Sequence, residues 1–292
     1  MPATRLVGLI GHPVGHSRSP AMQQTAFDAL CIAARYVFWE TPPDALAERI
    51  ASLRAPDVLG ANVTIPYKTA VVPLLDELAS SAQQAGNAVN TIVRDEHGRL
   101  IGYNTDVTGI VRVLDAHGVD GSGRSLLALG AGGAARAVWA AARERGMALR
   151  VVARHPEAAL AALVAAGFAS TAVVSLDDRD RLTEALAASG VVINATSVGM
   201  GDPLASPLPE PLLAYPPPGA LVFDMVYAPL ETALLRAARA RGLRTATGLE
   251  ILLEQGAAAF QLWTGQEAPI AAMRAALGVN DMNDMNDASA AE

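Results

Sequence analysis

Short apolar runs alternate along the chain with longer segments in which apolar residues recur every three or four positions. Such a run is too short for a helix and predicts a buried strand, whereas the longer period predicts a helix with one buried face. The predicted strands are residues 5–10, 34–39, 126–129, 149–153, 191–194 and 220–223, and the predicted helices are residues 20–30, 43–53, 107–114, 134–145 and 249–263. Strands that alternate with helices indicate an α/β protein with a doubly wound parallel sheet.

A glycine-rich turn is the strongest single signal in the sequence. Gly130-Ala131-Gly132-Gly133-Ala134 connects the apolar run at residues 126–129 to a predicted Ala-rich helix. Gly130 allows a sharp turn, and Gly132 leaves no Cβ between the backbone and a diphosphate bound by the first N–H groups of the helix. The pattern favours a dinucleotide-binding domain, although glycine-rich turns also join strands to helices in proteins without a nucleotide.

The end of the next predicted strand bears on the choice of cofactor. NAD-binding folds commonly place an acidic residue there for the ribose hydroxyls, but this chain has Arg154 and His155 after residues 149–153. A positive charge suits the 2′-phosphate of NADP. We therefore expect NADP as the cofactor, with NAD as the alternative.

The loop after the first predicted strand contains Ser17, Arg18 and Ser19 ahead of Pro20. A residue that precedes proline favours the extended conformation, which would turn both serine hydroxyls to one side and Arg18 to the other. Two hydroxyl groups on one side suit a carboxylate ligand. The alternative is structural, with Ser19 as the N-cap of helix 20–30 and Pro20 as its first residue.

A second polar segment contains Asn62, Thr64, Pro66 and Lys68. Asn62 and Thr64 share a face if the segment is extended, and Pro66 is expected to begin a helix with Lys68 in its first turn. The positive end of a helix dipole disfavours a cation, which would make this lysine a better proton donor and acceptor near neutral pH. The alternative is an ordinary solvated lysine.

Short polar side chains also gather at the ends of apolar segments further along the chain. They are Asn90, Thr91, Asn104, Thr105 and Asp106. Ligands bind at the ends of strands in an α/β sheet, so these residues are candidate ligand contacts. They are equally common in turns and N-caps, and Thr105 or Asp106 is the expected N-cap of the helix that follows.

The C-terminal segment combines a predicted helix with a polar end. Gln255 lies at the flank of the apolar stripe of helix 249–263, where it would reach either a cleft or solvent. Residues 280–292 repeat Asn, Asp and Met and are expected to form a disordered tail. No His/Cys cluster and no Gly-x-Ser-x-Gly motif occurs in the chain, so neither metal chemistry nor serine hydrolysis is indicated.

Composition limits the kind of partner. The length of 292 residues suggests about two domains, and 29 acidic against 22 basic residues give a net charge of −7. That charge works against a nucleic-acid or anionic-membrane partner. No apolar run is long enough to span a membrane, and the N-terminal segment lacks the pattern of a signal peptide. Cys31 is the only cysteine, so we expect no internal disulfide and a cytoplasmic location.

Taken together, these motifs resemble the shikimate dehydrogenase family over nearly the whole chain. The matching stretches are His16-Ser-Arg-Ser-Pro20, Asn62-Val-Thr-Ile-Pro-Tyr-Lys68, Asn87-Ala-Val-Asn-Thr91, Gly102-Tyr-Asn-Thr-Asp106, Gly130-Ala-Gly-Gly-Ala134, Asn194-Ala-Thr-Ser-Val-Gly-Met200, Asp224-Met-Val-Tyr227 and Gln255. The resemblance implies NADP-dependent, reversible reduction of 3-dehydroshikimate to shikimate in aromatic amino-acid biosynthesis. It also implies two α/β domains with a deep cleft between them.

The resemblance further implies domain limits and residue roles. A substrate-binding domain is implied at residues 1–104, completed by C-terminal helices at 244–279, and a Rossmann-type dinucleotide-binding domain at 105–243. Lys68 and Asp106 are implied as the catalytic pair, and no metal site is implied. The implied substrate contacts are Ser17, Ser19, Thr64, Asn90, Tyr227 and Gln255. The implied cofactor contacts are Gly130, Ala131, Gly132, Gly133, Ala134, Arg154, Thr196, Met225 and Gly248.

The chain departs from the family pattern at two places. Gln23 and Gln24 stand where the family commonly has His-Asn, and Ala158 stands where it typically has a second arginine for NADP. The second departure predicts a weaker preference for NADP. A quinate or dual quinate/shikimate dehydrogenase, a non-catalytic dinucleotide-binding regulator and, last, a methyltransferase are the alternatives. The expected assembly is a monomer or a homodimer.

Overall fold

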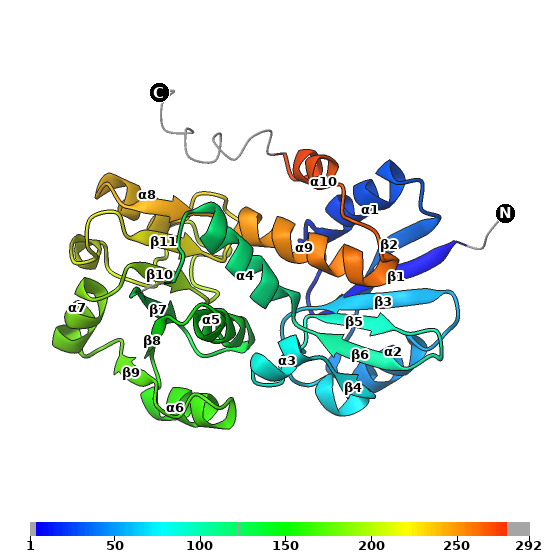
Figure 1. The fold of residues 1–292 in the computed structure, drawn as a ribbon, viewed down its shortest axis with the longest axis horizontal. Helices are drawn as coiled ribbons and strands as arrows, with labels where there is room; N and C mark the ends of the chain where they lie inside the picture. The colour runs from blue at the N-terminus through cyan, green and yellow to red at the C-terminus, as the bar shows by residue number, and fades with distance from the viewer. Residues whose placement is uncertain (1–3, 122, 279–292) are drawn as a thin grey trace. The chain divides into compact units, whose positions relative to one another are not determined.

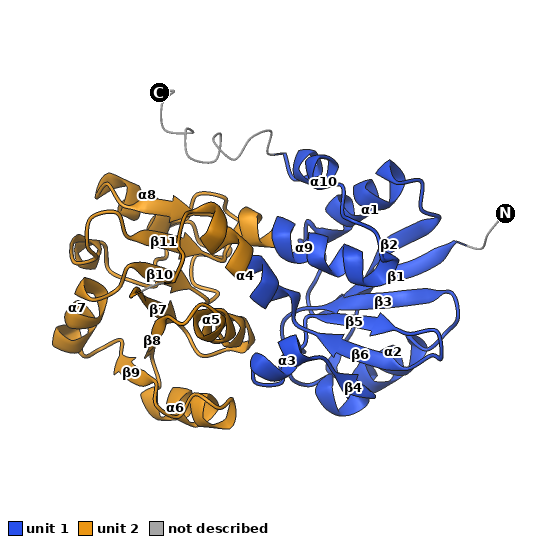
Figure 2. Cartoon of the chain, in the orientation of Figure 1, with its two compact units in different colours: residues 1–109, 253–292 blue, residues 110–252 orange. Residues whose placement is uncertain are grey.

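The computed structural model describes residues 4–121 and 123–278, which form two compact units (Figure 1). One unit comprises Met1–Gly109 and Leu253–Glu292, and the other comprises Ile110–Leu252 (Figure 2). Two helices, α4 (Thr105–Ala116) and α9 (Gly248–Thr264), begin in one unit and end in the other. The predicted tail at residues 280–292 lies outside the described residues.

The first unit is built on a mixed sheet with the strand order β2-β1-β3-β5-β6-β4. Its strands are β1 (Arg5–Gly11), β2 (Ala34–Glu40), β3 (Val58–Val63), β4 (Glu77–Leu78), β5 (Thr91–Arg94) and β6 (Leu100–Tyr103). The β1 strand runs parallel to both β2 and β3, whereas β5 is antiparallel to β3 and β6. The predicted strands at residues 5–10 and 34–39 are confirmed.

Helices complete this unit. The helices are α1 (Ser19–Ala29), α2 (Leu46–Ser52), α3 (Ser80–Gln84), α10 (Ile270–Ala276) and the 3₁₀ helices Pro43–Ala45 and Val72–Leu74. Gln23 of α1 donates to the carbonyl oxygen of Gly256 in α9 at 2.9 Å, and Gln24 accepts from the N–H of Tyr36 in β2 at 3.0 Å. The two glutamines thus attach α1 to α9 on one side and to β2 on the other.

The second unit has an entirely parallel sheet with the order β12-β11-β10-β7-β8-β9. Its strands are β7 (Ser125–Leu129), β8 (Ala148–Ala153), β9 (Ala172–Ser175), β10 (Val191–Asn194), β11 (Leu221–Asp224) and β12 (Arg244–Ala246). Its helices are α5 (Gly133–Glu144), α6 (Pro156–Ala165), α7 (Arg179–Ala187), α8 (Ala233–Ala240) and the 3₁₀ helix Glu210–Ala214. The predicted doubly wound parallel sheet is confirmed.

The strand order of this sheet identifies where a ligand binds. From β7 the chain moves outward through β8 to β9, then returns to β10 on the other side of β7 and moves outward through β11 to β12. The order therefore reverses between β7 and β10. In open α/β sheets, ligands bind beyond the carboxyl ends of the strands at such a reversal. Gly130 follows β7 and Ala195 follows β10, so both lie at this point.

Three predictions about helix ends are wrong. The N-cap of α1 is Arg18, not Ser19, and the backbone N–H of Ser19 donates to Ser17 Oγ at 3.2 Å. Asn104, not Thr105 or Asp106, precedes α4, and its Oδ1 accepts from the N–H of Val107 at 3.3 Å. Helix α1 therefore begins one residue before the expected residue 20, and α4 begins two residues before the expected residue 107. In each case a neighbouring side chain accepts a hydrogen bond from an unpaired N–H group near the helix start.

The third error concerns the segment after Pro66. Residues 64–71 form turns without an α-helix, and the next helical segment is the 3₁₀ helix Val72–Leu74. The carbonyl oxygen of Lys68 accepts from the N–H of Val89 at 2.7 Å, so a distant loop takes the backbone bond that a helix needs. Lys68 therefore does not lie at a helix N-terminus, and the expected helix-dipole effect on it is absent.

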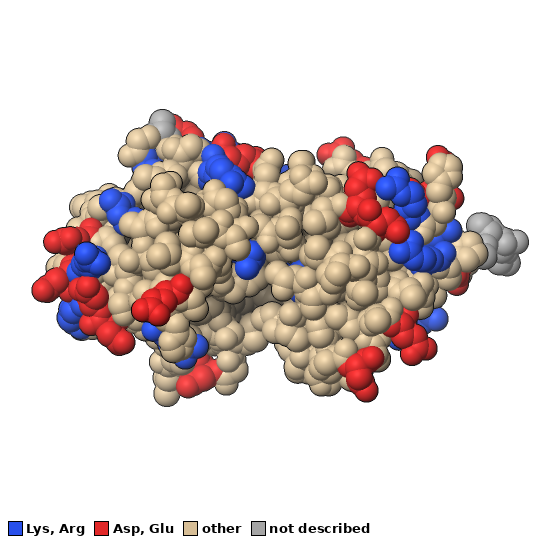
Figure 3. All heavy atoms as spheres, turned by 90° about the horizontal axis from the view of Figure 1, so that it is seen from below, with Lys and Arg blue, Asp and Glu red and all other residues tan. Residues whose placement is uncertain are grey.

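The surface carries charges of both signs. Acidic and basic side chains lie among one another on the face in Figure 3, most of which consists of other residues. Within residues 4–121 and 123–278, no helix has the length and hydrophobicity needed to cross a bilayer.

Candidate active site

Lys68 and Asp106 form an ion pair in the first unit, with 2.5 Å between Nζ and Oδ2. Lys68 comes from the loop after β3, and Asp106 lies in the first turn of α4, where the helix dipole favours a negative charge. The exposed fractions of the two side chains are 15% and 9%. An ammonium group held this far from solvent beside one carboxylate is suited to exchange a proton with a bound molecule.

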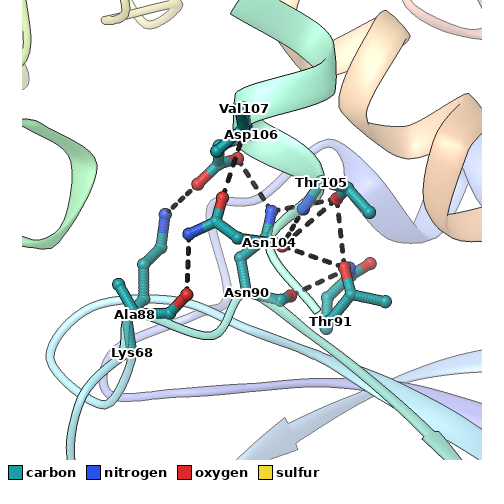
Figure 4. A network of polar contacts seen from close by, with 9 residues as sticks. Lys68, Ala88, Asn90, Thr91, Asn104, Thr105, Asp106 and Val107 are labelled. Atoms are coloured by element: carbon teal, nitrogen blue, oxygen red, sulfur yellow. Dashed lines mark hydrogen bonds and ion pairs between the residues drawn. The ribbon is translucent and has the colours of Figure 1, made fainter. Parts of the chain in front are cut away.

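Asn90 fixes the other oxygen of this carboxylate (Figure 4). Its Nδ2 donates to Asp106 Oδ1 at 2.8 Å, and its Oδ1 accepts from the backbone N–H of Thr105 at 2.7 Å and from Thr91 Oγ1 at 3.1 Å. A backbone N–H only donates, so the atom that faces it must be the amide oxygen. The amide N–H₂ therefore faces Asp106, and the orientation of Asn90 follows from the start of α4.

Further polar groups hold the backbone of Asn90 and the side chain of Thr91 by hydrogen bonds. Asn62 Nδ2 donates to the carbonyl oxygen of Asn90 at 3.1 Å and to Thr91 Oγ1 at 3.0 Å. The hydroxyl of Tyr36 donates to Asn62 Oδ1 at 2.8 Å. Asn62 and Tyr36 are both buried, so this network is shielded from water. Tyr36 was missed from the sequence, because only the β2-β1-β3 order brings it to Asn62.

The other predicted substrate contacts of this unit lie outside the hydrogen-bond network of Lys68, Asp106 and Asn90. Ser19 is buried, Ser17 and Thr64 are half-buried, and Gln255 is 9% exposed in α9. Gly11 permits a close approach here, because a Cβ at this position would lie 2.5 Å from Thr64 Cγ2. Among the described residues, Ser17, Ser19 and Thr64 make no hydrogen bond to Lys68 or Asp106. Tyr227 belongs to the second unit, after β11, and is half-buried.

The glycine turn has the geometry needed for an anion. Gly130 has a φ of +107°, and a Cβ there would lie 2.9 Å from Thr196 Cγ2, so only glycine fits without strain. Gly132 is the N-cap of α5, and no described atom lies within 4 Å of where its Cβ would be. The first turn of α5 has neither a side-chain cap nor an acidic residue. Its N–H groups thus form a cradle for a negatively charged group.

Two other segments of the second unit contain predicted cofactor contacts. Gly248, at the start of α9, approaches the loop after β11 so closely that a Cβ would lie 2.5 Å from the carbonyl carbon of Val226 and 2.6 Å from the oxygen of Met225. Arg154 follows β8, is exposed, and makes no ion pair or hydrogen bond to another described residue. The predicted positive charge after β8 is therefore available to a ligand. Ala158 is exposed in α6 and adds no charge.

Arg136 is a cation that the sequence pattern did not single out. It lies in the first turn of α5 and is half-buried. Burial lowers the pKa of its guanidinium, which remains charged at neutral pH.

Within the part of the chain that the structure describes, no group of three or more His, Cys, Asp or Glu side chains is arranged to hold a metal ion.

Comparison with known proteins identifies the family. A family model described as the shikimate dehydrogenase substrate binding domain matches residues 9–92, and one described as the shikimate 5′-dehydrogenase C-terminal domain matches residues 248–277. A shikimate dehydrogenase (NADP(+)) from Symbiobacterium thermophilum is 46% identical over 280 residues, which cover 93% of this chain and 93% of the relative. The chain belongs to the shikimate dehydrogenase family.

Solved structures of family members agree in fold. Shikimate 5-dehydrogenase from Thermus thermophilus, in complex with NADP(H) and shikimate, matches with a TM-score of 0.82 and 41% identity, covering 93% of this chain and 98% of that one. Quinate dehydrogenase from Corynebacterium glutamicum, in complex with NAD, matches with a TM-score of 0.82 and 32% identity, covering 94% and 99%. The two neighbours therefore differ in the acid for which they are named and in the cofactor bound.

Proposed function

We propose that this family member catalyses the NADP-dependent, reversible reduction of 3-dehydroshikimate to shikimate, as expected from its motifs. The observation that carries the proposal is the shielded pair of Lys68 and Asp106, whose carboxylate is held by Asn90. The relatives named as NADP-dependent shikimate dehydrogenases support the same activity. A non-catalytic regulator has no need for a buried ion pair of this kind.

Lys68 is proposed as the group that exchanges the proton. The bound dinucleotide supplies the hydride, and hydride addition to the ketone leaves negative charge on its oxygen. Lys68 stabilises that charge and delivers a proton from Nζ to the oxygen, and in the reverse direction it removes the proton from the hydroxyl. Asp106 holds the ammonium group in place, and its distance of 2.5 Å from Nζ supports this assignment.

The substrate is proposed to bind in the domain formed by residues 1–104 and 244–279. Ser17 and Ser19, with Tyr227, would hold the carboxylate, because hydroxyl groups donate to its oxygens. Thr64, Asn90, Asp106 and Gln255 would bind the ring hydroxyls. The burial of Ser19, Asn90 and Asp106 supports these roles, because a buried polar group left without a partner disfavours an analogue that lacks one hydroxyl.

The dinucleotide is proposed to bind in the domain formed by residues 105–243. The main-chain groups of Gly130, Ala131, Gly132, Gly133 and Ala134 would hold the diphosphate at the start of α5. Arg154 would bind the 2′-phosphate, and Thr196, Met225 and Gly248 would line the nicotinamide end. The residues fit this group, because the uncapped α5 and the open space at Gly132 leave a cradle that a Cβ would fill.

Steady-state kinetics test the proposal directly. Shikimate and quinate are each assayed with NADP and with NAD, and we expect the highest kcat/KM for shikimate with NADP. Comparable values for quinate would favour the dual-specificity alternative. The structural match to a quinate dehydrogenase is the observation that favours this alternative. Absence of turnover with all four pairs would overturn the enzyme assignment.

The proposal also includes a cytoplasmic location, which cell fractionation would test. It further includes assembly as a monomer or a homodimer, which analytical sedimentation would measure.

A further inference from the structure

Asp224 is a fully buried carboxyl group that the proposed proton transfer does not use. It ends β11, and its side chain is 0% exposed. It accepts hydrogen bonds from Asn194 Nδ2 at 2.8 Å, from the N–H of Val226 at 3.0 Å and from Thr232 Oγ1 at 2.7 Å. Burial raises the pKa of this carboxyl, while the three hydrogen bonds oppose that shift. A group so costly to bury stays in place only when its partners are well arranged.

Asp224 and the loop after β10 fix the same orientation of the Asn194 amide, whose Nδ2 donates both to Asp224 and to the carbonyl oxygen of Val198 at 3.2 Å. A carboxylate only accepts hydrogen bonds, so the amide nitrogen of Asn194 must face it and the amide oxygen must face away. That oxygen accepts from the N–H of Thr196 at 3.0 Å and from Thr196 Oγ1 at 2.7 Å. Thr196 Oγ1 in turn accepts from the N–H of Val198 at 3.1 Å. The loop after β10 is therefore folded around this one amide.

Thr196 connects the network to the glycine turn. Its Cγ2 lies against Gly130, where an added Cβ would be only 2.9 Å away. Strands β7, β10 and β11 are neighbours in the sheet, and their carboxyl ends carry Gly130, Asn194 and Asp224. The turn that would hold the diphosphate and the loop at Thr196 are thus joined to one buried carboxyl group.

We propose that Asp224 is a positioning residue for the dinucleotide, which sets the affinity for NADP by orienting Asn194 and, through it, Thr196 against the glycine turn. This inference rests on the proposed function, because NADP is the ligand. The chain of contacts lies entirely within the second unit, at the reversal of its strand order. Asp224 acts through Asn194 and Thr196 and not by contact with the ligand.

Calorimetric titration of the full-length protein with NADP, in the absence of substrate, tests the inference. Asp224→Leu keeps the approximate shape but removes the acceptor, and we expect its Kd for NADP to rise about tenfold or more. Asp224→Asn should bring the Kd back to within about threefold of the parent value, because its amide oxygen still accepts from Asn194 and its N–H₂ can donate to Thr232. Recovery of the Kd in Asp224→Asn but not in Asp224→Leu would show that the hydrogen bond accepted from Asn194, and not the volume of the side chain, sets the affinity.

Ser189→Ala is the matched control. Ser189 is also fully buried in the second unit and donates to the carbonyl oxygen of Ala185 at 2.7 Å, but it precedes β10, at the other end of the strand from Asn194. The control should lower the thermal midpoint of unfolding without weakening NADP binding. Loss of affinity in this control comparable to that in Asp224→Leu would reduce the effect to general destabilisation and overturn the inference.

Asn194→Ala removes the amide through which the effect is transmitted, and it serves if Asp224→Leu does not fold. We expect it to weaken NADP binding in the same direction, by about tenfold. Parent-like Kd values in the folded variants would overturn the role of Asp224. Failure of the parent protein itself to bind NADP would instead count against the proposed function, so the two failures are distinguishable.

Discussion

Replacing Lys68 with methionine removes the ammonium group beside Asp106 while keeping an unbranched side chain of similar length. Turnover should fall by at least about 10²-fold, because a lost proton-transfer group costs about 10²–10⁴ and a lost donor to a developing oxyanion costs about 2.7–4 kcal/mol. Both functions belong to one nitrogen, so the two effects do not add.

The structure also bounds the effect on stability. Removing one partner of a fully buried ion pair costs about 3–5 kcal/mol. Lys68 keeps 15% exposure, and Asp106 retains both its bond from Asn90 and its place in the first turn of α4. We therefore expect a loss of only about 1–3 kcal/mol in the free energy of unfolding. The loss of activity should greatly exceed what this destabilisation explains at room temperature.

Arg54→Met is the matched control for Lys68→Met. Arg54 also forms an ion pair in the first unit, with Asp76 at 2.6 Å, but the two side chains are 41% and 34% exposed. Exposed pairs contribute about 0–1 kcal/mol, so this variant should fold and turn over like the parent. The assays are kcat with shikimate and NADP, calorimetric Kd for NADP, and urea unfolding. If Lys68→Met retained kcat within about threefold of the parent, Lys68 would not be the proton-transfer group.

Further predictions concern other residues. Arg154→Ala should lower kcat/KM for NADP by about ten- to a hundredfold and leave that for NAD nearly unchanged, because a charge-assisted bond to the 2′-phosphate is lost; an unchanged ratio in steady-state kinetics would refute this. Burial raises the pKa of the Asp224 carboxyl in the folded protein above its value in the unfolded chain. The parent protein therefore loses stability as pH rises from the unfolded-state pKa to the folded-state pKa. Asp224→Asn should remove this loss, so its thermal midpoint should exceed that of the parent increasingly above about pH 4 and match it below; equal midpoints throughout would contradict the cause. Gln23→Met removes one hydrogen bond to Gly256 and also a buried Oε1 without a partner among the described residues, so the free energy of unfolding should change by less than about 1 kcal/mol. A loss above about 2 kcal/mol in urea unfolding would show that Oε1 is bonded in solution.

Local sequence patterns determined the four central strands of the second unit and the helix after its glycine turn, but not β9, β12 or the helices α6, α7 and α8. The apolar runs became β7, β8, β10 and β11 with ends within about one residue of the prediction. The glycine turn lies between β7 and α5 as expected. These features depend on residues close together in the chain: the length of an apolar run, the helical period of the next segment, and the positive φ that Gly130 tolerates.

Tertiary contacts decided the rest, because they supply hydrogen-bond partners that are distant in the sequence. Val89 takes the carbonyl oxygen of Lys68 and prevents the helix expected after Pro66. The N–H of Thr105 orients Asn90, and the sheet order brings Tyr36 to Asn62. A buried polar group must find a partner somewhere, but the sequence alone does not say which of several candidates lies within reach. Folding makes that choice, and with it the geometry around Lys68 and Asp106.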